Sequence, residues 1–185
     1  MALPQIQNIM STVDVGCRLD LPHIHKHSSN TEYNPKKFNP VIMGIKNPKS
    51  TALIFASGKI VITGTKDEES TKIAAQIFVK EIDTLGFHSV QFLNFRITNI
   101  VASAQLPFRP PLFNDQFLPA NKMKLVDYEP ELFPGLVYRT GITVIVFRSG
   151  KVIMTKAKTR EQIYNVYSEF IKSIDRGTDT ERRVA

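Results

Sequence analysis

The chain has very little cysteine: Cys17 stands alone, so no disulfide framework can form within it. A single thiol fits a reducing compartment, and we interpret it as a small buried apolar side chain rather than a reactive nucleophile. No apolar run approaches the roughly 20 residues that a membrane-spanning helix needs. The opening segment MALPQIQNIM also lacks the basic flank and long apolar centre of a secretory signal. These absences predict a soluble intracellular chain with no membrane partner.

Motifs that are typical of enzymes are missing as well. The sequence contains no G-x-S-x-G, and Gly58-Lys59 lacks the upstream glycine of a phosphate-binding loop. The acidic run 67–69 precedes a helical pattern, where capping and the helix dipole explain it. The histidines of HIHKH (23–27) have no fourth ligand in phase, which favours a solvated basic loop over a metal site. We therefore expect no catalytic residues, no metal and no cofactor.

Acidic residues are absent from two long stretches, 33–66 and 133–160, although both contain several lysines or arginines. The net charge of the chain is +7, and the acids gather elsewhere, for example at 67–69 and 127–131. A chain that separates charge in this way twice is typical of proteins that present a cationic surface to a polyanion, most simply nucleic acid.

The two basic stretches belong to an internal duplication. Tyr33 and Phe38 recur 95 residues later as Tyr128 and Phe133, and the IFASGKIVIT segment recurs 92 residues later as VFRSGKVIMT. Upstream, the segment QNIMSTV matches TNIVASA, which lies 91 residues later. Self-similarity at a fixed spacing predicts two copies of one structural unit. We place the first repeat at 5–94, the second at 95–175, and a mobile tail at 176–185.

Each copy shows the pattern of a strand, a short helix or loop, three strands and a longer helix. TALIFASGKIVIT (51–63) reads as a hairpin, since two β-branched runs flank Ala-Ser-Gly. The first long helix is expected to start at Asp67 or Ser70 and to end at Gly86. Its expected apolar stripe consists of Ile73, Ala74, Ile77, Ile82 and Leu85. The second is expected to be capped by Thr159, with a stripe of Ile163, Val166, Tyr167, Phe170, Ile171 and Ile174.

The strands of the hairpin are apolar on both faces, which an antiparallel sheet with one face in water does not need. One face must pack on the helices. The other must meet something flat and partly apolar, such as a second protein or the floor of a nucleic-acid groove.

The segments YNPKKF, ALIFASGK, YEPELFPGL and SGKV, in this duplicated layout, resemble the core domain of the eukaryotic TATA-binding protein family. The resemblance extends from about Gln5 to Ile174. It implies an α+β saddle of two quasi-symmetric repeats, in which a curved antiparallel ten-stranded sheet carries helices on its convex face. It also implies a nuclear general transcription initiation factor that binds the minor groove of A·T-rich promoter DNA and nucleates the preinitiation complex.

The resemblance assigns site residues by position. The DNA-intercalating wedges are Phe38, Phe55, Phe133 and Phe147. The minor-groove contacts are Asn8, Asn99, Thr63, Thr155, Val61, Leu53, Val101 and Ile153. The expected phosphate contacts are Lys36, Lys37, Lys59, Arg139, Arg148 and Lys151. The docking surface for transcription factor IIB falls on Glu129, Glu131 and Leu132, and transcription factor IIA, TBP-associated factors and RNA polymerase are further implied partners.

These residue types suit the minor groove. A·T pairs offer acceptors there, whereas a G·C pair adds an amino group that an apolar floor leaves unpaired. Asn and Thr can donate to the A·T acceptors, and prolines beside Phe38 and Phe133 favour rigid presentation of the wedges.

The chain also departs from the family pattern. Gly44 stands where arginine is usual, Lys156 where glycine is usual, and Met10 where valine is usual. Phe133 and Phe147 are 14 residues apart whereas Phe38 and Phe55 are 17 apart, so three residues are missing between the second pair. Because the flanking spacings are kept, we predict a tight turn at Thr140-Gly141, with glycine at positive φ.

Two other interpretations remain. One is an enzyme domain of a related fold, for which the sequence offers no catalytic segment. The other is a paralogue that acts mainly as a protein scaffold with weak or altered DNA specificity, against which the four retained phenylalanines argue.

Overall fold

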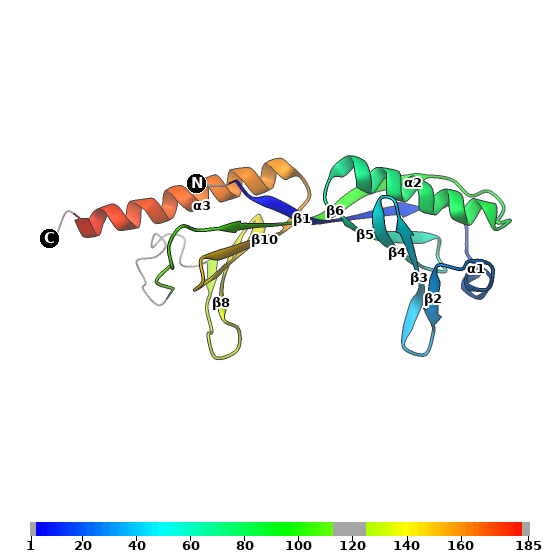
Figure 1. Cartoon of the computed structure of the whole chain (residues 1–185), viewed down its shortest axis with the longest axis horizontal. Coiled ribbons are helices and arrows are strands. Elements are labelled where there is room, and N and C mark those ends of the chain that lie inside the picture. Colours follow the sequence, from blue (N-terminus) through cyan, green and yellow to red (C-terminus); the bar gives the residue numbers. More distant parts are fainter. Residues whose placement is uncertain (1–2, 113–124, 183–185) are drawn as a thin grey trace. The chain divides into compact units, whose positions relative to one another are not determined.

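The computed structural model of the 185-residue chain describes the backbone of residues 3–112 and 125–182, and side chains as far as Ile174 (Figure 1). The described residues form ten strands and three helices. The strands are β1 (Gln5–Asp14), β2 (Thr31–Asn34), β3 (Phe38–Lys46), β4 (Lys49–Ile54), β5 (Lys59–Thr65), β6 (Leu93–Gln105), β7 (Val126–Asp127), β8 (Gly135–Thr140), β9 (Ile142–Phe147) and β10 (Lys151–Ala157). The helices are α1 (Leu21–His27), α2 (Glu68–Thr84) and α3 (Arg160–Arg182).

The fold consists of two compact units. The first unit is Asn8–Asn99, and the second unit joins Met1–Gln7 to Ile100–Ala185. The long strands β1 and β6 each contribute residues to both units. No helix in the described ranges is long and apolar enough to cross a membrane.

In the first unit the strands follow the order β2-β3-β4-β5-β1, with antiparallel pairing. Figure 1 shows α2 lying along one face of this sheet, where it contacts β5. The core lies between them, and fully buried Ile54, Ile60 and Ile62 from the strands pack with Phe78 and Ile82 from α2. Alternate strand residues point to the opposite face, which no helix among the described residues covers. We call this the open face of the first unit.

Helix α2 begins where its cap predicts. The Asp67 side chain accepts a hydrogen bond from the Ser70 N–H at 2.7 Å, and Gly86 adopts φ +85° just beyond the helix end. The expected apolar stripe is partly wrong, because Ile73 is exposed. Phe78 and Val79 are buried in its place. Periodicity tolerates either assignment, and the direction of approach of the sheet decides between them.

The HIHKH segment is a helix rather than the expected loop. Asp20 caps α1 by accepting from the His23 N–H at 3.1 Å. The His23 ring bonds the Leu85 carbonyl at 3.0 Å, and the His27 ring bonds the His23 carbonyl at 2.9 Å. These bonds give both rings structural roles. In the described part of the chain, no three metal-ligating side chains come together.

The second unit repeats the plan with the order β6-β10-β9-β8-β7. Helix α3 contacts β9 and β10, and the buried residues include Val144, Val152 and Phe170. Thr159 caps α3 as expected, because its Oγ1 accepts from the Gln162 N–H at 3.2 Å. The helix continues to Arg182, past Ile174, the last residue of the expected apolar stripe, and into the segment 176–185 that is expected to be a tail. Residues 183–185 lie outside the described part.

The strand register is duplicated in the two units as well. On one face, Ile42, Leu53, Val61 and Thr12 form a row of directly paired residues across the first unit. In the second unit the corresponding row is Val137, Ile145, Ile153 and Ser103. The α+β class with ten antiparallel strands is thus confirmed. The pattern of three strands after the first one is wrong, because β2 and β7 are too short to show a periodic signal.

The three-residue deletion lies where the spacing predicts it. Thr140 pairs with Ile142, and Gly141 between them adopts φ +58°. In the first unit Lys46 pairs with Lys49 across the longer Asn47-Pro48 connection. A tight turn absorbs the deletion, so the side chains of β9 keep the same faces as those of β4.

Candidate nucleic-acid interface

The open face of the first unit carries the apolar residues expected to contact a groove. Leu53 on β4 and Val61 on β5 are direct partners, and both are half-buried while their neighbours Ile54 and Ile62 are fully buried. The two apolar faces of β4 and β5 therefore have different roles. One set of residues builds the core, and the other forms a flat apolar surface without a helix over it.

Polar residues lie beside this surface and are held in place. Asn8 Nδ2 donates to Thr63 Oγ1 at 2.9 Å, and Asn8 Oδ1 accepts from the Gly64 N–H at 2.8 Å. These bonds fix the amide group while leaving its second N–H outside this pair. Asn8 and Thr63, which the sequence assigns to the same role, are thus brought together.

Asn99 has a different neighbour. Its Nδ2 lies 3.9 Å from the sulfur of Met10, a weak acceptor. Both residues are half-buried. Met10 and Val101 are 91 residues apart and occupy equivalent positions in the two repeats. The longer thioether therefore takes the place of a compact branched side chain beside an expected groove contact.

In the second unit the expected groove residues also lie opposite the helix. Val101 is half-buried between buried Ile100 and Ala102 on β6. Ile153 and Thr155 on β10 are half-buried and alternate with buried Val152 and Met154.

The wedge candidates of the first unit lie at hairpin ends. Phe38 is 46% exposed at the start of β3, next to a turn closed by the Lys37 N–H bonding the Asn34 carbonyl at 3.0 Å. Phe55 follows directly after β4. Its N–H donates to the Lys59 carbonyl and its carbonyl accepts from the Gly58 N–H, each at 3.0 Å. Turns tied by backbone hydrogen bonds give both rings firm backbone support.

The second pair of phenylalanines is in direct contact. The Phe133 ring, 41% exposed, meets the Phe147 ring edge-on with centroids 5.9 Å apart. The N–H of Phe133 bonds the Glu129 carbonyl at 2.9 Å, which closes the turn that presents it. No comparable ring contact joins Phe38 and Phe55, although both lie in the described segments.

Gly135 is a site residue that the sequence analysis missed. A Cβ added there would lie 2.7 Å from Cε1 of Phe133, 2.8 Å from Cγ2 of Ile145 and 3.2 Å from Cε1 of Phe147. Both wedge rings therefore lie directly over the bare Cα of Gly135. The motif FPGL contains this glycine, but its linear context does not reveal which rings lie above it.

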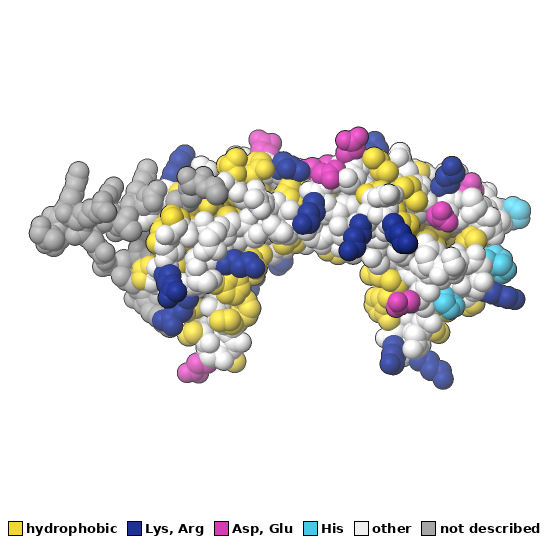
Figure 2. All heavy atoms as spheres, in the orientation of Figure 1, with side chains coloured by type: hydrophobic (Ala, Val, Ile, Leu, Met, Phe, Trp, Pro, Cys, Tyr) yellow, Lys and Arg dark blue, Asp and Glu magenta, His cyan; other side chains and the backbone are white. Residues whose placement is uncertain are grey.

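All six expected phosphate contacts are exposed: Lys36, Lys37, Lys59, Arg139, Arg148 and Lys151. Figure 2 shows basic side chains at the tip of the β2–β3 hairpin, which carries the first two. Arg139 forms an ion pair with Asp127, with Nη2 and Oδ2 3.7 Å apart and both side chains more than half exposed. An exposed pair of this kind is weak, so Arg139 can exchange its partner.

The expected protein-docking residues protrude from the same turn as Phe133. Glu129 and Glu131 are exposed, and Leu132 is 81% exposed. A large apolar side chain flanked by two carboxylates is typical of a protein contact.

Lys156 adopts a conformation that disfavours side chains. Its φ is +68°, and Gly64, which is 92 residues earlier, has φ +105°. Register shifts occur at both positions, between Met154 and Ala157 and between Ile9 and Ser11. The bulge is therefore kept in both repeats, although the second has lost its glycine.

Comparison with known proteins identifies the family. A sequence profile described as "Transcription factor TFIID (or TATA-binding protein, TBP)" matches residues 3–85 and 94–176. The chain belongs to the TATA-binding protein family. It is similar to the "Methanococcus jannaschii TBP" structure, with a TM-score of 0.75 and 32% identity over 95% of this chain and 99% of that one. The fold that the sequence resemblance implies is thereby confirmed.

Curated relatives agree with this assignment. The TATA-box-binding protein of Acanthamoeba castellanii is 49% identical over 168 residues, which cover 89% of this chain and 64% of the relative. That of Saccharomyces cerevisiae is 46% identical over 168 residues, which cover 89% of this chain and 68% of the relative. The chain thus spans roughly half to two thirds of the length of the relatives compared, as in Bombyx mori, where it covers 53%.

Proposed function

We propose that this chain is a general transcription initiation factor that binds the minor groove of A·T-rich promoter DNA, kinks it with paired phenylalanines and nucleates the preinitiation complex. The observation that carries the proposal is that each unit presents a flat, partly apolar open face that ends in phenylalanines on tied turns. Family membership supports the same proposal, because the matching relatives are named for TATA-box binding.

The chemistry of the open face favours A·T pairs. Leu53, Val61, Val101 and Ile153 would pack against the groove floor. A G·C pair would place its amino group against these apolar side chains without a partner, which disfavours it. Asn8, Thr63, Asn99 and Thr155 would supply donors for the adenine N3 and thymine O2 acceptors.

Phenylalanine rings would act as wedges. Members of this family are themselves a standard example of minor-groove proteins that insert apolar side chains between base steps and bend the duplex. Insertion needs exposed rings on backbone that does not yield, and Phe38 and Phe133 meet that need. Exposed lysines and arginines would neutralise phosphates along the groove.

The remaining assignments follow from the same proposal. Glu129, Glu131 and Leu132 would dock transcription factor IIB through their exposed turn. Transcription factor IIA, TBP-associated factors and RNA polymerase are the other expected partners, and the nucleus is the expected location. We propose no enzymatic activity. The scaffold paralogue is not favoured, because the relatives compared above are TATA-box-binding proteins.

The experiment is a titration of the chain against a duplex that contains TATAAA and against one with G·C substitutions in that element. Energy transfer between dyes at the two duplex ends reports bending. We expect tight binding and bending of the first duplex alone, with affinity that falls steeply as salt rises. Equal affinity for both duplexes, or binding without bending, would overturn the proposal.

Variants at Asn8 separate specificity from folding. Asn8→Asp keeps the size of the side chain but replaces a donor with a carboxylate that repels the groove acceptors. We expect the preference for TATAAA to fall while the melting temperature changes little. Loss of folding together with binding would show that Asn8 supports the core rather than the recognition surface.

A further inference from the structure

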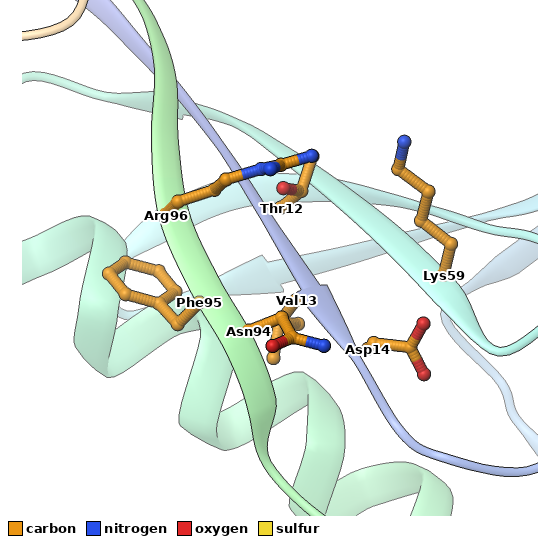
Figure 3. Close-up of a pocket in the computed structure, with 7 residues that line it drawn as sticks. All are labelled: Thr12, Val13, Asp14, Lys59, Asn94, Phe95 and Arg96. Atoms are coloured by element: carbon orange, nitrogen blue, oxygen red, sulfur yellow. The ribbon is translucent and has the colours of Figure 1, made fainter.

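An open pocket of about 470 Å³ lies within the first unit, lined by residues of β1, β5 and β6. Thr12 and Asp14 come from β1, Lys59 from β5 and Arg96 from β6. Figure 3 shows the Arg96 side chain reaching across β1 toward Thr12, with the Asp14 carboxylate near the base of the Lys59 side chain. The pocket therefore holds two cationic groups and one carboxylate. We call it the Lys59 pocket.

The Lys59 pocket is part of the open face. Thr12 pairs directly with Val61, and Asp14 pairs directly with Lys59, so these side chains share a face. Val61 is an expected groove contact. Lys59 lies two residues before Val61 on β5 and so is nearer to Phe55, which follows the end of β4. A duplex on this face would thus run its backbone past the Lys59 pocket.

The duplication offers an internal comparison. Lys151, the counterpart of Lys59, pairs directly with Gln105, whereas Lys59 pairs with Asp14. At the same spacing of 91 residues, Arg96 corresponds to Gln5. The second unit therefore has two neutral glutamines, Gln5 and Gln105, at the positions where the first unit has Arg96 and Asp14. The net charge of the two sets is the same, but the first has an extra cation and an extra anion.

We propose that Lys59 and Arg96 together hold one backbone phosphate of the bound duplex in this pocket, and that Asp14 weakens this contact by repulsion. The inference rests on the proposed function, and Arg96 is its new element. A guanidinium offers several donors in a fixed plane that match phosphate oxygens, and an ammonium adds a point charge. The Thr12 hydroxyl, which lines the same pocket, adds a neutral donor.

Asp14 is oriented for this role. Its Oδ1 accepts a hydrogen bond from the Gly16 N–H at 2.7 Å, which holds the carboxylate at the pocket. A carboxylate in the same pocket as two cations lowers the local positive potential and so reduces the attraction of any anion. The counterpart of Asp14 in the second unit, Gln105, is neutral and cannot reduce the attraction in this way. The two units are therefore expected to contribute unequally to phosphate binding.

The test combines protein variants with duplexes in which single phosphates are replaced by neutral methylphosphonates. Arg96→Gln and Lys59→Gln are compared with Lys80→Gln, which removes an exposed charge from α2, the helix on the opposite face. We expect Arg96→Gln to make the slope of log affinity on log salt shallower by about one. Lys80→Gln should keep the slope of the unsubstituted chain.

Combining each protein variant with each methylphosphonate duplex identifies the phosphate that Lys59 and Arg96 contact. One methylphosphonate should weaken binding of the unsubstituted chain, and should weaken binding of Arg96→Gln or Lys59→Gln by a smaller factor, because each variant keeps only one of the two contacts. Coupling of the two variants to different phosphates, or no coupling for Arg96→Gln, would overturn the inference. If the unsubstituted chain bound no A·T-rich duplex, the proposed function itself would fail, which is a distinct result.

Asp14→Gln introduces the residue type of the second repeat. We expect its affinity for the unmodified duplex to rise by about two- to fivefold, the range of exposed charge interactions. Unchanged or lower affinity would remove Asp14 from the proposal. Thermal unfolding of every variant shows whether the fold is kept.

Discussion

The ring of Phe133 lies edge-on against the ring of Phe147, with 5.9 Å between centroids and 66° between ring planes. The bare Cα of Gly135 lies beneath them both. This contact forms although the segment from Phe133 to Phe147 is three residues shorter than the segment from Phe38 to Phe55 in the first unit. The shortened hairpin has therefore kept its aromatic pair in place.

Replacement of Phe133 and Phe147 by alanine should reduce DNA bending about as much as replacement of Phe38 and Phe55. Each pair is expected to open one base step, so loss of either pair should remove roughly half of the bend. End-to-end energy transfer on a TATAAA duplex measures the change. Full bending after loss of Phe133 and Phe147 would mean that this pair does not act as a wedge.

Gly135→Ala should disturb the same pair from below. The added Cβ would lie within 3 Å of atoms in Phe133 and Ile145. Overpacking of this kind lowers the free energy of unfolding by about 1–3 kcal/mol. Bending should also fall, because the Phe133 ring has to move.

Gly44→Ala is the matched control, since no atom lies within 4 Å of an added Cβ there. We expect its free energy of unfolding to stay equal or to rise by up to about 1 kcal/mol. Chemical denaturation of both variants checks the prediction. Equal effects of the two alanines would show that the rings do not press on Gly135.

Sequence alone predicts much of this architecture because the repeats carry their signals in local patterns. The caps Asp67 and Thr159 and the turn at Gly141 follow from short-range rules, and the structure has all three. Exposure of Ile73 does not follow, because helical periodicity leaves two adjacent stripes possible.

The candidate site divides in the same way. Pairing of Asn8 with Thr63 joins residues 55 positions apart, and only the register of β1 and β5 brings them together. Gly135 is invisible as a site residue because its importance depends on the rings above it. Asp14 and Arg96 can be found from the sequence, because the residues 91 positions away from them, Gln105 and Gln5, are neutral.

Lys156→Gly should stabilise the chain. Lys156 adopts φ +68°, where a side chain costs about 1–2 kcal/mol. Glycine removes this strain but loses more backbone entropy on folding, so the net gain should be about 0.5–1 kcal/mol in the free energy of unfolding. Chemical denaturation gives the value.

Lys158→Gly serves as the control for Lys156→Gly, because it removes the same charge at a nearby exposed position whose φ is not positive. There the substitution should lower the free energy of unfolding by about 0.5 kcal/mol or more. If both variants lost stability alike, the bulge at Lys156 would not be strained.

Tyr167 on α3 is the basis of the last prediction. It is 5% exposed, and no described residue offers its hydroxyl a hydrogen bond. An unpaired buried hydroxyl costs about 1–3 kcal/mol. Tyr167→Phe should therefore raise the free energy of unfolding at neutral pH by about 1 kcal/mol or more, at almost unchanged volume.

The dependence on pH gives a second, independent measure of the same variant. Burial raises the pKa of Tyr167 above its ordinary value of 10.0, because the charged phenolate is desolvated. The unfolded chain therefore loses this proton first as pH rises, so the stabilising effect of the neutral phenol is complete below pH 10 and declines above it. Tyr167→Phe should lose less stability than the parent chain between pH 9 and about pH 11. Tyr164→Phe is the control, because Tyr164 is a half-buried neighbour on α3. It should change the free energy of unfolding at neutral pH by less than about 0.5 kcal/mol. Parallel alkaline unfolding curves for the parent chain and Tyr167→Phe would show that the Tyr167 hydroxyl reaches water in the folded protein.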